Sequence, residues 1–215
     1  MNAARFRKLR DVLDRRQPDL TVLMERVHKP HNFSAILRNC DAVGVLEAHA
    51  VPTEEGLEVY EGTSAGTSKW VRVRRHPDVE TGVRVLHEAG FRIVAAHPEP
   101  DATDYRDVDF TGPTAIMVGA ELHGLSERGL ALADRRVVVP MRGMVRSLNV
   151  SVATALLLFE AHRQREEAGL YQGSRLEPER YRRVLFEWAY PRVARRYRER
   201  DEPYPGLDEH GRLLR

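Results

Sequence analysis

The sequence is poor in cysteine and has no long apolar run. Cys40 is the single cysteine among 215 residues, which excludes an internal disulfide and a multi-cysteine metal site. No apolar run reaches the length of about 18 residues that a membrane-spanning helix needs, so we expect no membrane span. Met1–Arg5 lacks the apolar segment of a secretory signal. Together these absences favour a reducing cytoplasm as the protein's location.

Several signatures of common enzyme classes are also missing. No P-loop and no G-x-G-x-x-G pattern occurs, which disfavours an ATPase and a Rossmann dinucleotide site. No G-x-S-x-G elbow surrounds Ser147, so a serine nucleophile is not expected. His28 and His31 lie close together, but no further Cys/His pair completes a zinc site. We therefore expect no metal.

Charge is abundant and unevenly distributed. Residues 1–16 carry six Arg/Lys against two acids, and residues 163–200 carry eleven Arg against six acids. Residues 17–162, by contrast, carry a net charge of −5. Basic arms around an acidic middle suggest a polyanionic partner such as nucleic acid. Two solvated charged helices remain the alternative, because acids are interleaved with the arginines.

Hydrophobic periodicity predicts alternating strands and helices. Strands are expected at 20–27, 45–51, 71–74, 91–96, 114–119 and 136–141, and helices at 4–16, 33–43, 78–89, 126–133, 150–165 and, with a break near Pro191, 177–200. Residues 53–69 are expected to form a long loop, and the tail from Asp201 to be loose. The apolar stripe of the 150–165 helix is predicted to be Val152, Ala155, Leu156, Leu158 and Phe159. The alternation predicts an α/β fold with a mostly parallel sheet and helices on both faces.

Three loops that follow strands carry the chemistry-bearing residues, namely 28–39, 119–125 and 140–149. Ligands of parallel sheets bind outside the carboxyl ends of the strands. Arg38 could clamp a phosphate, or it could pair with Asp41 on the helix surface. Glu121 could accept hydrogen bonds from a ribose or a base, or compensate the partial positive charge of a helix N-terminus. Ser147 or Asn149 could cap the following helix.

Taken together, the three loops resemble the motifs of the SpoU/TrmH branch of the SPOUT methyltransferases. Asn32–Arg38, Val118–Leu125 and Pro140–Ser151 resemble its first, second and third motifs, in the family's order. The resemblance covers about residues 18–168, and the tail beyond about residue 200 matches nothing that we can assign.

The resemblance implies a fold, a domain plan and a cofactor. The C-terminal part of the sheet domain, about 135–165, would form a deep trefoil knot, and the protein would be a homodimer with active sites at the subunit interface. The domains would be a basic helical arm (1–17), the methyltransferase domain (18–168) and a basic helical extension with a tail (169–215). S-adenosylmethionine would bind in the knot, cradled by Ala96, Gly119, Val139, Met141 and Leu148.

The implied activity is transfer of a methyl group to a ribose 2′-hydroxyl of RNA. The expected catalytic residues are Asn32, Arg38, Glu121, Ser147 and Asn149. The expected RNA contacts are Arg5, Arg7, Lys8, Arg10, Arg15, Arg16, Arg163, Arg182 and Arg183. The short arms favour tRNA, with guanosine 18 as the target. Methylation of rRNA by the same fold, and a non-catalytic RNA-binding protein, are the alternatives.

Overall fold

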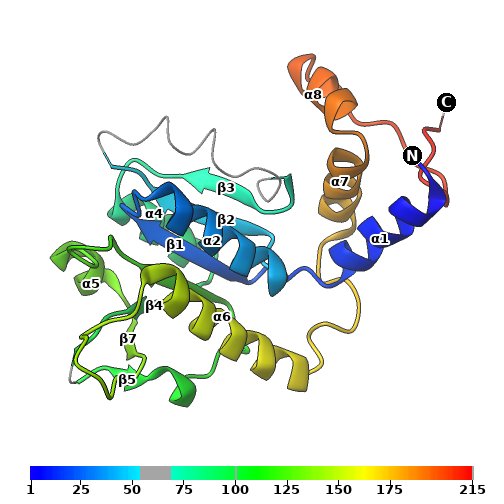
Figure 1. Cartoon of the computed structure of the whole chain (residues 1–215). Coiled ribbons are helices and arrows are strands. Elements are labelled where there is room, and N and C mark those ends of the chain that lie inside the picture. The colour runs from blue at the N-terminus through cyan, green and yellow to red at the C-terminus, as the bar shows by residue number, and fades with distance from the viewer. Residues whose placement is uncertain (54–68, 100, 215) are drawn as a thin grey trace. The chain divides into compact units, whose positions relative to one another are not determined.

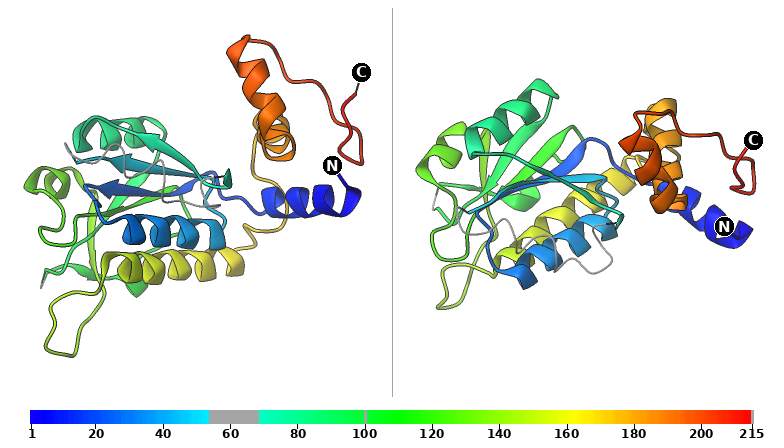
Figure 2. Two further views of the ribbon diagram at one scale, coloured as in Figure 1. Left: turned by 45° about the horizontal axis from the view of Figure 1, so that its top comes forward. Right: turned by 90° about the horizontal axis from the view of Figure 1, so that it is seen from above.

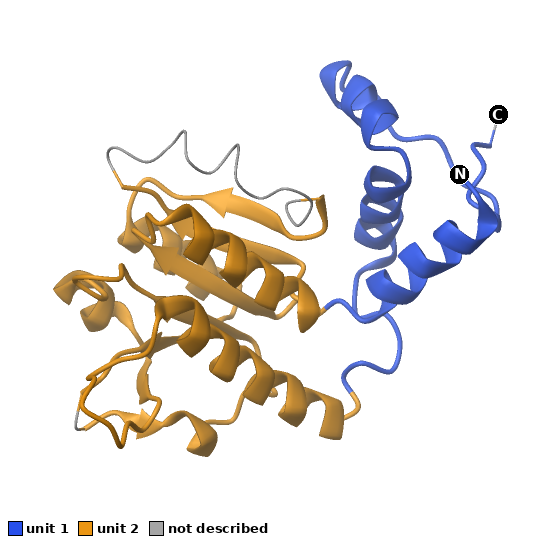
Figure 3. Cartoon of the chain, viewed as in Figure 1, with its two compact units in different colours: residues 1–16, 170–215 blue, residues 17–169 orange. Residues whose placement is uncertain are grey.

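A computed structural model describes residues 1–53, 69–99 and 101–214. The expected long loop at 53–69 lies, apart from its two ends, outside the described residues. The chain forms two compact units, coloured separately in Figure 3. Unit 1 combines residues 1–16 with 170–215, and unit 2 comprises residues 17–169.

Unit 2 contains a parallel sheet, as the strand and helix alternation predicts (Figure 1). Its described strands are β1 (Leu20–Glu25), β2 (Glu47–Val51), β3 (Arg72–Arg75), β4 (Arg92–Ala96), β5 (Thr103–Asp104), β6 (Thr114–Val118) and β7 (Arg135–Val138). They lie in the order β3-β2-β1-β6-β4-β7-β5, and every pairing is parallel. β7 ends at Val138 instead of reaching Met141, since Pro140 has no amide hydrogen to continue the ladder.

Helices cover both faces of the sheet, which confirms the predicted layering. α2 (Pro30–Ala42) and α6 (Val150–Glu167) run side by side on one face, and α4 (Val79–Glu88) and α5 (Glu127–Leu132) lie on the other (Figure 2). Alternate residues of each strand serve the two faces. In β1, Val22 and Met24 join the core under α2 and α6, whereas Leu23 joins the core under α4.

The expected apolar stripe of α6 is only partly buried. Val152, Leu156 and Phe159 are exposed, while the buried side chains are Thr154, Leu157, Leu158, Ala161 and Arg165. Two of these buried residues are polar, and their hydrogen bonds make burial possible. The apolar stripe and the buried face of this helix therefore coincide only in part.

Unit 1 contains α1 (Ala3–Asp14), α7 (Pro178–Ala189) and α8 (Pro191–Glu199). The expected break near Pro191 is confirmed. The tail after Asp201 is not loose, because Tyr204 stacks on Phe186 with the ring centroids 4.6 Å apart. The hydroxyl of Tyr190 also donates to the Gly211 carbonyl at 2.8 Å. Such aromatic packing could not be read from a polar, proline-containing stretch.

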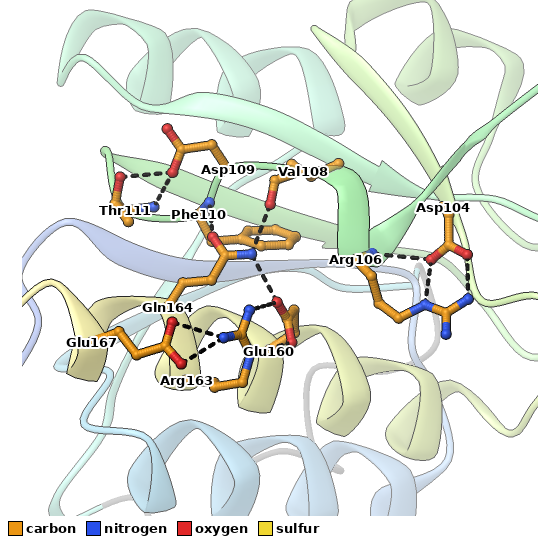
Figure 4. Close-up of polar contacts among 10 residues, drawn as sticks. All are labelled: Asp104, Arg106, Val108, Asp109, Phe110, Thr111, Glu160, Arg163, Gln164 and Glu167. Carbon is orange, nitrogen blue, oxygen red and sulfur yellow. Dashed lines mark hydrogen bonds and ion pairs between the residues drawn. The ribbon is translucent and has the colours of Figure 1, made fainter.

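The end of α6 is fastened to the rest of unit 2 by buried polar side chains. The Arg165 guanidinium is fully buried and donates to the carbonyls of Phe110 and Gly112 and to Asp19 and Gln17. The adjacent Gln164 donates to the Val108 carbonyl and accepts from the Phe110 amide, as Figure 4 shows. The segment 108–112, which precedes β6, is thus tied to α6.

Replacement of Arg165 by Met tests this fastening. Loss of the guanidinium leaves Asp19 and several carbonyls without their donor, so we expect the free energy of unfolding to fall by about 3–5 kcal/mol. The control is Arg163→Met, two residues away, whose guanidinium is exposed and pairs with Glu160 and Glu167 (Figure 4). Exposed pairs add little stability. Urea denaturation that gave the two variants equal stability would contradict the assignment.

Candidate active site

The three motif loops meet at one edge of the sheet. β1, β6, β4 and β7 are parallel neighbours, so their carboxyl ends lie side by side. The residues that follow these ends include His28, Gly119 and Val139. α2 begins at Pro30 instead of Phe33, because a proline fits the first helical turn, and this places Asn32 in that turn.

Asn32 is the residue that joins the three loops. Its Nδ2 donates to Oε1 of Glu121 at 2.6 Å, and its Oδ1 accepts from Nδ2 of Asn149 at 3.1 Å. Asn32 is buried, with 2% of its surface exposed. Three of the five expected catalytic residues are therefore in direct contact, and we call Asn32, Glu121 and Asn149 the Asn32 junction.

Among the described residues, Glu121 is hydrogen-bonded through one carboxylate oxygen, and the other faces a histidine ring without a hydrogen bond. While Oε1 accepts from Asn32, Oε2 lies 3.1 Å from Nδ1 of His28. Burial raises the pKa of the Glu121 carboxyl, but the Asn32 hydrogen bond and the positive charges of His28 and Lys29 outweigh burial, so the net pKa lies below its usual value. Glu121 is consequently a fixed negative charge. His28 had stood out in the sequence only as an unsupported zinc ligand.

The loop that carries Glu121 has a tight backbone. Ala120 and Gly124 exchange two backbone hydrogen bonds, of 3.0 and 2.8 Å. A Cβ on Gly119 would lie 2.1 Å from the Gly124 carbonyl carbon, so only glycine fits there. The loop's far end is held by the buried Glu25, whose carboxylate accepts from the amide and the hydroxyl of Ser126. Glu25 was missed, although an acid in an otherwise apolar strand was a signal for it.

The start of α6 is also fixed by amide side chains. Asn149 caps the helix, because its Oδ1 accepts from the amide and the hydroxyl of Ser151 at 2.8 and 2.7 Å. Capping and the bond to Asn32 use different atoms, so Asn149 performs both roles. Asn39 of α2 donates to the Ser151 carbonyl at 3.0 Å. α2 and α6 are thereby locked together beside the junction.

Arg38 and Ser147 are not bonded to the Asn32 junction in the described structure. Arg38 is exposed on α2, and Ser147 is exposed in the loop before α6. Arg38 nevertheless neighbours Asn39, which contacts the start of α6, so it belongs to the same side of the sheet as the third motif. An exposed guanidinium there is available to an external phosphate.

The five expected cofactor residues fall into one region. Ala96, Gly119 and Val139 are at or next to the carboxyl ends of β4, β6 and β7, which are adjacent strands. Met141 and Leu148 are half-buried in the loop that follows β7. This set offers backbone groups and apolar side chains, which suit a nucleoside with an uncharged base.

Most of the expected RNA contacts are exposed on unit 1. Arg5, Arg7, Lys8, Arg10, Arg15, Arg182 and Arg183 are all exposed. Arg16 is a correction, because it is fully buried with its guanidinium 5.1 Å from the Trp188 ring centroid. Arg163 belongs to unit 2 and is occupied by two glutamates. Unit 1 as a whole has 17 Arg/Lys and 10 Asp/Glu, and α8 adds the exposed Arg192, Arg195, Arg196 and Arg198.

The described residues contain no candidate for a membrane span or for a metal site. No helix among them combines the length and the apolar character needed to cross a bilayer. Within the same ranges, no three His, Cys, Asp or Glu side chains are grouped as metal ligands.

Substitution Asn32→Asp tests the polarity of the junction with almost no change of shape. The aspartate cannot donate to Glu121, and two close carboxylates must share a proton, which raises the pKa of one of them. A raised folded-state pKa gives stability that is lost as pH rises through it, so the variant should lose about 1–3 kcal/mol relative to the parent on going from mildly acidic to neutral pH. Urea denaturation across that range measures this, with Asn2→Asp as the control, since the Asn2 side chain accepts from the Arg5 amide at 2.8 Å and an aspartate can do the same. A pH-independent difference would count against the junction.

Comparison with known proteins agrees with the geometry. The SpoU rRNA Methylase family matches residues 19–159, and the SpoU rRNA methylase C-terminal family matches residues 163–215. The second match covers the tail, which the sequence had left unassigned. A tRNA (guanosine(18)-2′-O)-methyltransferase of Thermus thermophilus is 58% identical over 86% of this chain and 95% of its own length. An Escherichia coli protein of the same name is 45% identical over 99% of this chain and 94% of its own.

Solved structures show the same fold. The Aquifex aeolicus TrmH/SpoU tRNA modifying enzyme superposes with a TM-score of 0.81 at 42% identity, covering 88% of this chain and 97% of that one. The SpoU methyltransferase AviRb of Streptomyces viridochromogenes, in complex with the cofactor AdoMet, gives a TM-score of 0.60 at 31% identity over 70% of this chain and 62% of that one. The chain belongs to the SpoU methylase family.

Proposed function

We propose that this chain is an S-adenosylmethionine-dependent tRNA (guanosine-18) 2′-O-ribose methyltransferase that acts in the cytoplasm. The observation that carries the proposal is the Asn32 junction, in which one buried amide binds Glu121 and Asn149 from the other two motifs. Two relatives named for this reaction match almost their whole length in this chain. The basic surface of unit 1 supports an RNA substrate.

The methyl donor fits the region at the ends of β4, β6 and β7. A side chain on Gly119 would collide with the backbone of Gly124, so the chain that leaves β6 at this edge of the sheet carries no side chain there. Ala96, Gly119, Val139, Met141 and Leu148 would hold the donor there. When bound, S-adenosylmethionine supplies an electrophilic methyl group.

The chain's own residues would hold and polarise the ribose. The Asn32 junction fixes the Glu121 carboxylate, which can accept a hydrogen bond from a sugar hydroxyl. Arg38 would bind the neighbouring phosphate and stabilise negative charge developing on the 2′-oxygen. A guanidinium is always protonated and is not a base in this reaction. Ser147, exposed in the loop before Asn149, would add a hydrogen bond to the substrate.

The exposed face of α6 supports a homodimer. Val152, Leu156 and Phe159 are 48%, 37% and 48% exposed and share one side of the helix, by their spacing. Met144 and Val145, in the loop before α6, are exposed apolar side chains as well. A surface of this kind beside the site suits a second copy of the chain. A monomeric mass in sedimentation experiments at enzyme concentrations well above the assay range would contradict the dimer.

The trefoil knot has support from the strand order. β7 lies between β4 and β5, both of which precede it in sequence, so the later strand is inserted between two earlier ones. It then returns to α6, which binds residues 108–112. Residues of about 135–165 would form the knotted segment. An experimental structure in which this segment passes outside the 97–113 connection would overturn the knot.

The function is tested with unmodified tRNA and labelled donor. The expected product carries one 2′-O-methyl group on guanosine 18, located by mapping of the labelled nucleotide. A tRNA transcript with adenosine at position 18 is the matched control, and it should remain unlabelled. Label in rRNA only would favour the rRNA alternative, and donor binding without any transfer would favour a non-catalytic RNA-binding protein.

Substitution Arg38→Ala should remove methylation while donor binding is retained. Loss of a group that stabilises developing charge lowers kcat by about 10²–10³-fold. The control is Arg84→Ala, an exposed arginine of α4 that pairs with Glu88 on the opposite face of the sheet. Methyl transfer and donor titration measure the two effects. Near-normal turnover in Arg38→Ala would refute the assignment.

Unit 1 should dominate the salt dependence of tRNA binding. Arg195→Ala with Arg196→Ala removes two exposed charges of α8, and each lost phosphate contact should reduce the log–log salt slope by about 0.7–0.9. Arg84→Ala with Arg128→Ala, both in unit 2, removes the same charge as a control. Filter binding over a range of salt concentrations gives the slopes. Equal slopes for the two double variants would place the RNA surface elsewhere.

A further inference from the structure

Two buried histidines that the proposed reaction does not use lie on the α4 face of unit 2. His49 belongs to β2 and shares a face of that strand with Val51, which packs in the core under α4. His76 directly follows the last residue of β3. Their exposed fractions are 5% and 4%. Because a buried polar group normally needs a hydrogen-bond partner, the surroundings of both rings call for an explanation.

The two rings are hydrogen-bonded to each other. Nδ1 of His49 lies 2.8 Å from Nε2 of His76, and the ring planes are parallel to within 3°. Whichever tautomer is present, one of these nitrogens donates and the other accepts, so the bond needs at least one neutral ring. A first added proton would place a charge on the buried pair. A second would leave a hydrogen on both facing nitrogens, and the bond would have no acceptor.

The charged groups around the pair oppose its protonation on balance. Burial is the main cause that lowers the pKa of His49 from 6.5 to about 4, and the neighbouring charges of His76 and Arg74 act in the same direction. Burial and Arg74 also lower the pKa of His76, and Asp78 at the N-cap of α4 offsets this only in part. Glu47 of β2 lies 3.7 Å from Nε2 of His49, too far for a hydrogen bond, and its other oxygen pairs with an arginine of β3.

The histidine pair joins one end of the sheet to the rest of unit 2. Among the described strands β3 pairs with β2 alone, and it stands last in the strand order (Figure 1). Three of its four residues are exposed, and only Val73 packs against the core, so little apolar burial retains the strand. The ring of His76 also lies under α4, since a Cβ on Gly82 would come within 3.5 Å of it. The bond to His49 thus links β2, the end of β3 and the start of α4.

We propose that the His49–His76 pair is an acid-sensitive switch, which holds β3 to β2 at neutral pH and releases this end of the sheet when the rings are protonated. The pair binds protons less readily in the closed sheet than in the open segment, because burial lowers the pKa of both rings. The stability of the β3 end is therefore present above about pH 6.5 and is lost as the pH falls toward about 4. β1 and β6 are buried along their whole length, so they should stay paired in the same range.

Hydrogen exchange at single amides measures this release. The amides of Arg72 and His76 donate to carbonyls in or next to β2, so both lose their partners when β3 opens. Between pH 7 and pH 5 their protection, corrected for the intrinsic exchange rate, should fall by about 20-fold, for one proton taken up with a pKa of 6.5 in the open segment and about 4 in the closed one. The amide of Thr114, which donates to a carbonyl next to β1, should keep its protection.

Glutamine substitutions separate the switch from general acid lability. When His49→Gln and His76→Gln are combined, neither side chain can take up a proton. The acid-dependent loss of protection at the Arg72 amide should then vanish, even if the variant is less stable at every pH. The matched control is His87→Gln, which replaces a histidine of the last turn of α4 that is 40% exposed and pairs with Asp134 at 2.9 Å. This control should retain the pH dependence of the parent.

Three results would overturn the switch. In the parent protein, unchanged protection of the Arg72 amide down to pH 5 would show that β3 does not open. An equal loss of protection at the Thr114 and Arg72 amides would show that acid opens the whole sheet at once. In the double glutamine variant, a persistent acid-dependent loss at Arg72 would assign the effect to other groups. The first two measurements use the parent protein alone, so they decide the matter even if the variant does not fold.

Discussion

A single buried amide holds the site together. Asn32 donates with its nitrogen to a residue 89 positions away and accepts with its oxygen from one 117 positions away. Only a side chain with a donor and an acceptor on one short stem can serve both partners. The first turn of α2, the loop after β6 and the start of α6 therefore have fixed positions relative to one another, and the geometry of Glu121 and His28 depends on that arrangement.

Buried polar groups elsewhere in unit 2 maintain the same arrangement from a distance. Glu25 fixes the far end of the Glu121 loop through Ser126, and Arg165 fixes the far end of α6 through Asp19. Each is nearly or fully buried, so each depends on its partners to offset the cost of removing a charge from water. Apolar packing sets the layers of the fold, and these few charges set where the loops lie.

The layers were predictable because their signal is local, whereas much of the site was not. The alternation of strands with helices predicted the parallel sheet and its two covered faces, and three ordered motifs predicted the residues that meet at Asn32. The apolar periodicity did not identify the buried face of α6, because Thr154 and Arg165 are buried through hydrogen bonds that no periodicity reveals. The burial of Arg16 and the ordered tail around Tyr204 were not predicted for a related reason, since each side chain packs on an aromatic ring elsewhere in the sequence.

The composition of unit 1 has a consequence for the order of assembly. α1 is made first, yet it packs against α7, which is made only after all of unit 2. During synthesis, unit 2 can therefore fold before α7 is available to α1. The contact between α1 and α7, which lie far apart in the sequence, must form last. A ribosome-bound fragment would lack the assembled basic surface. Only completed chains would then bind tRNA through this surface.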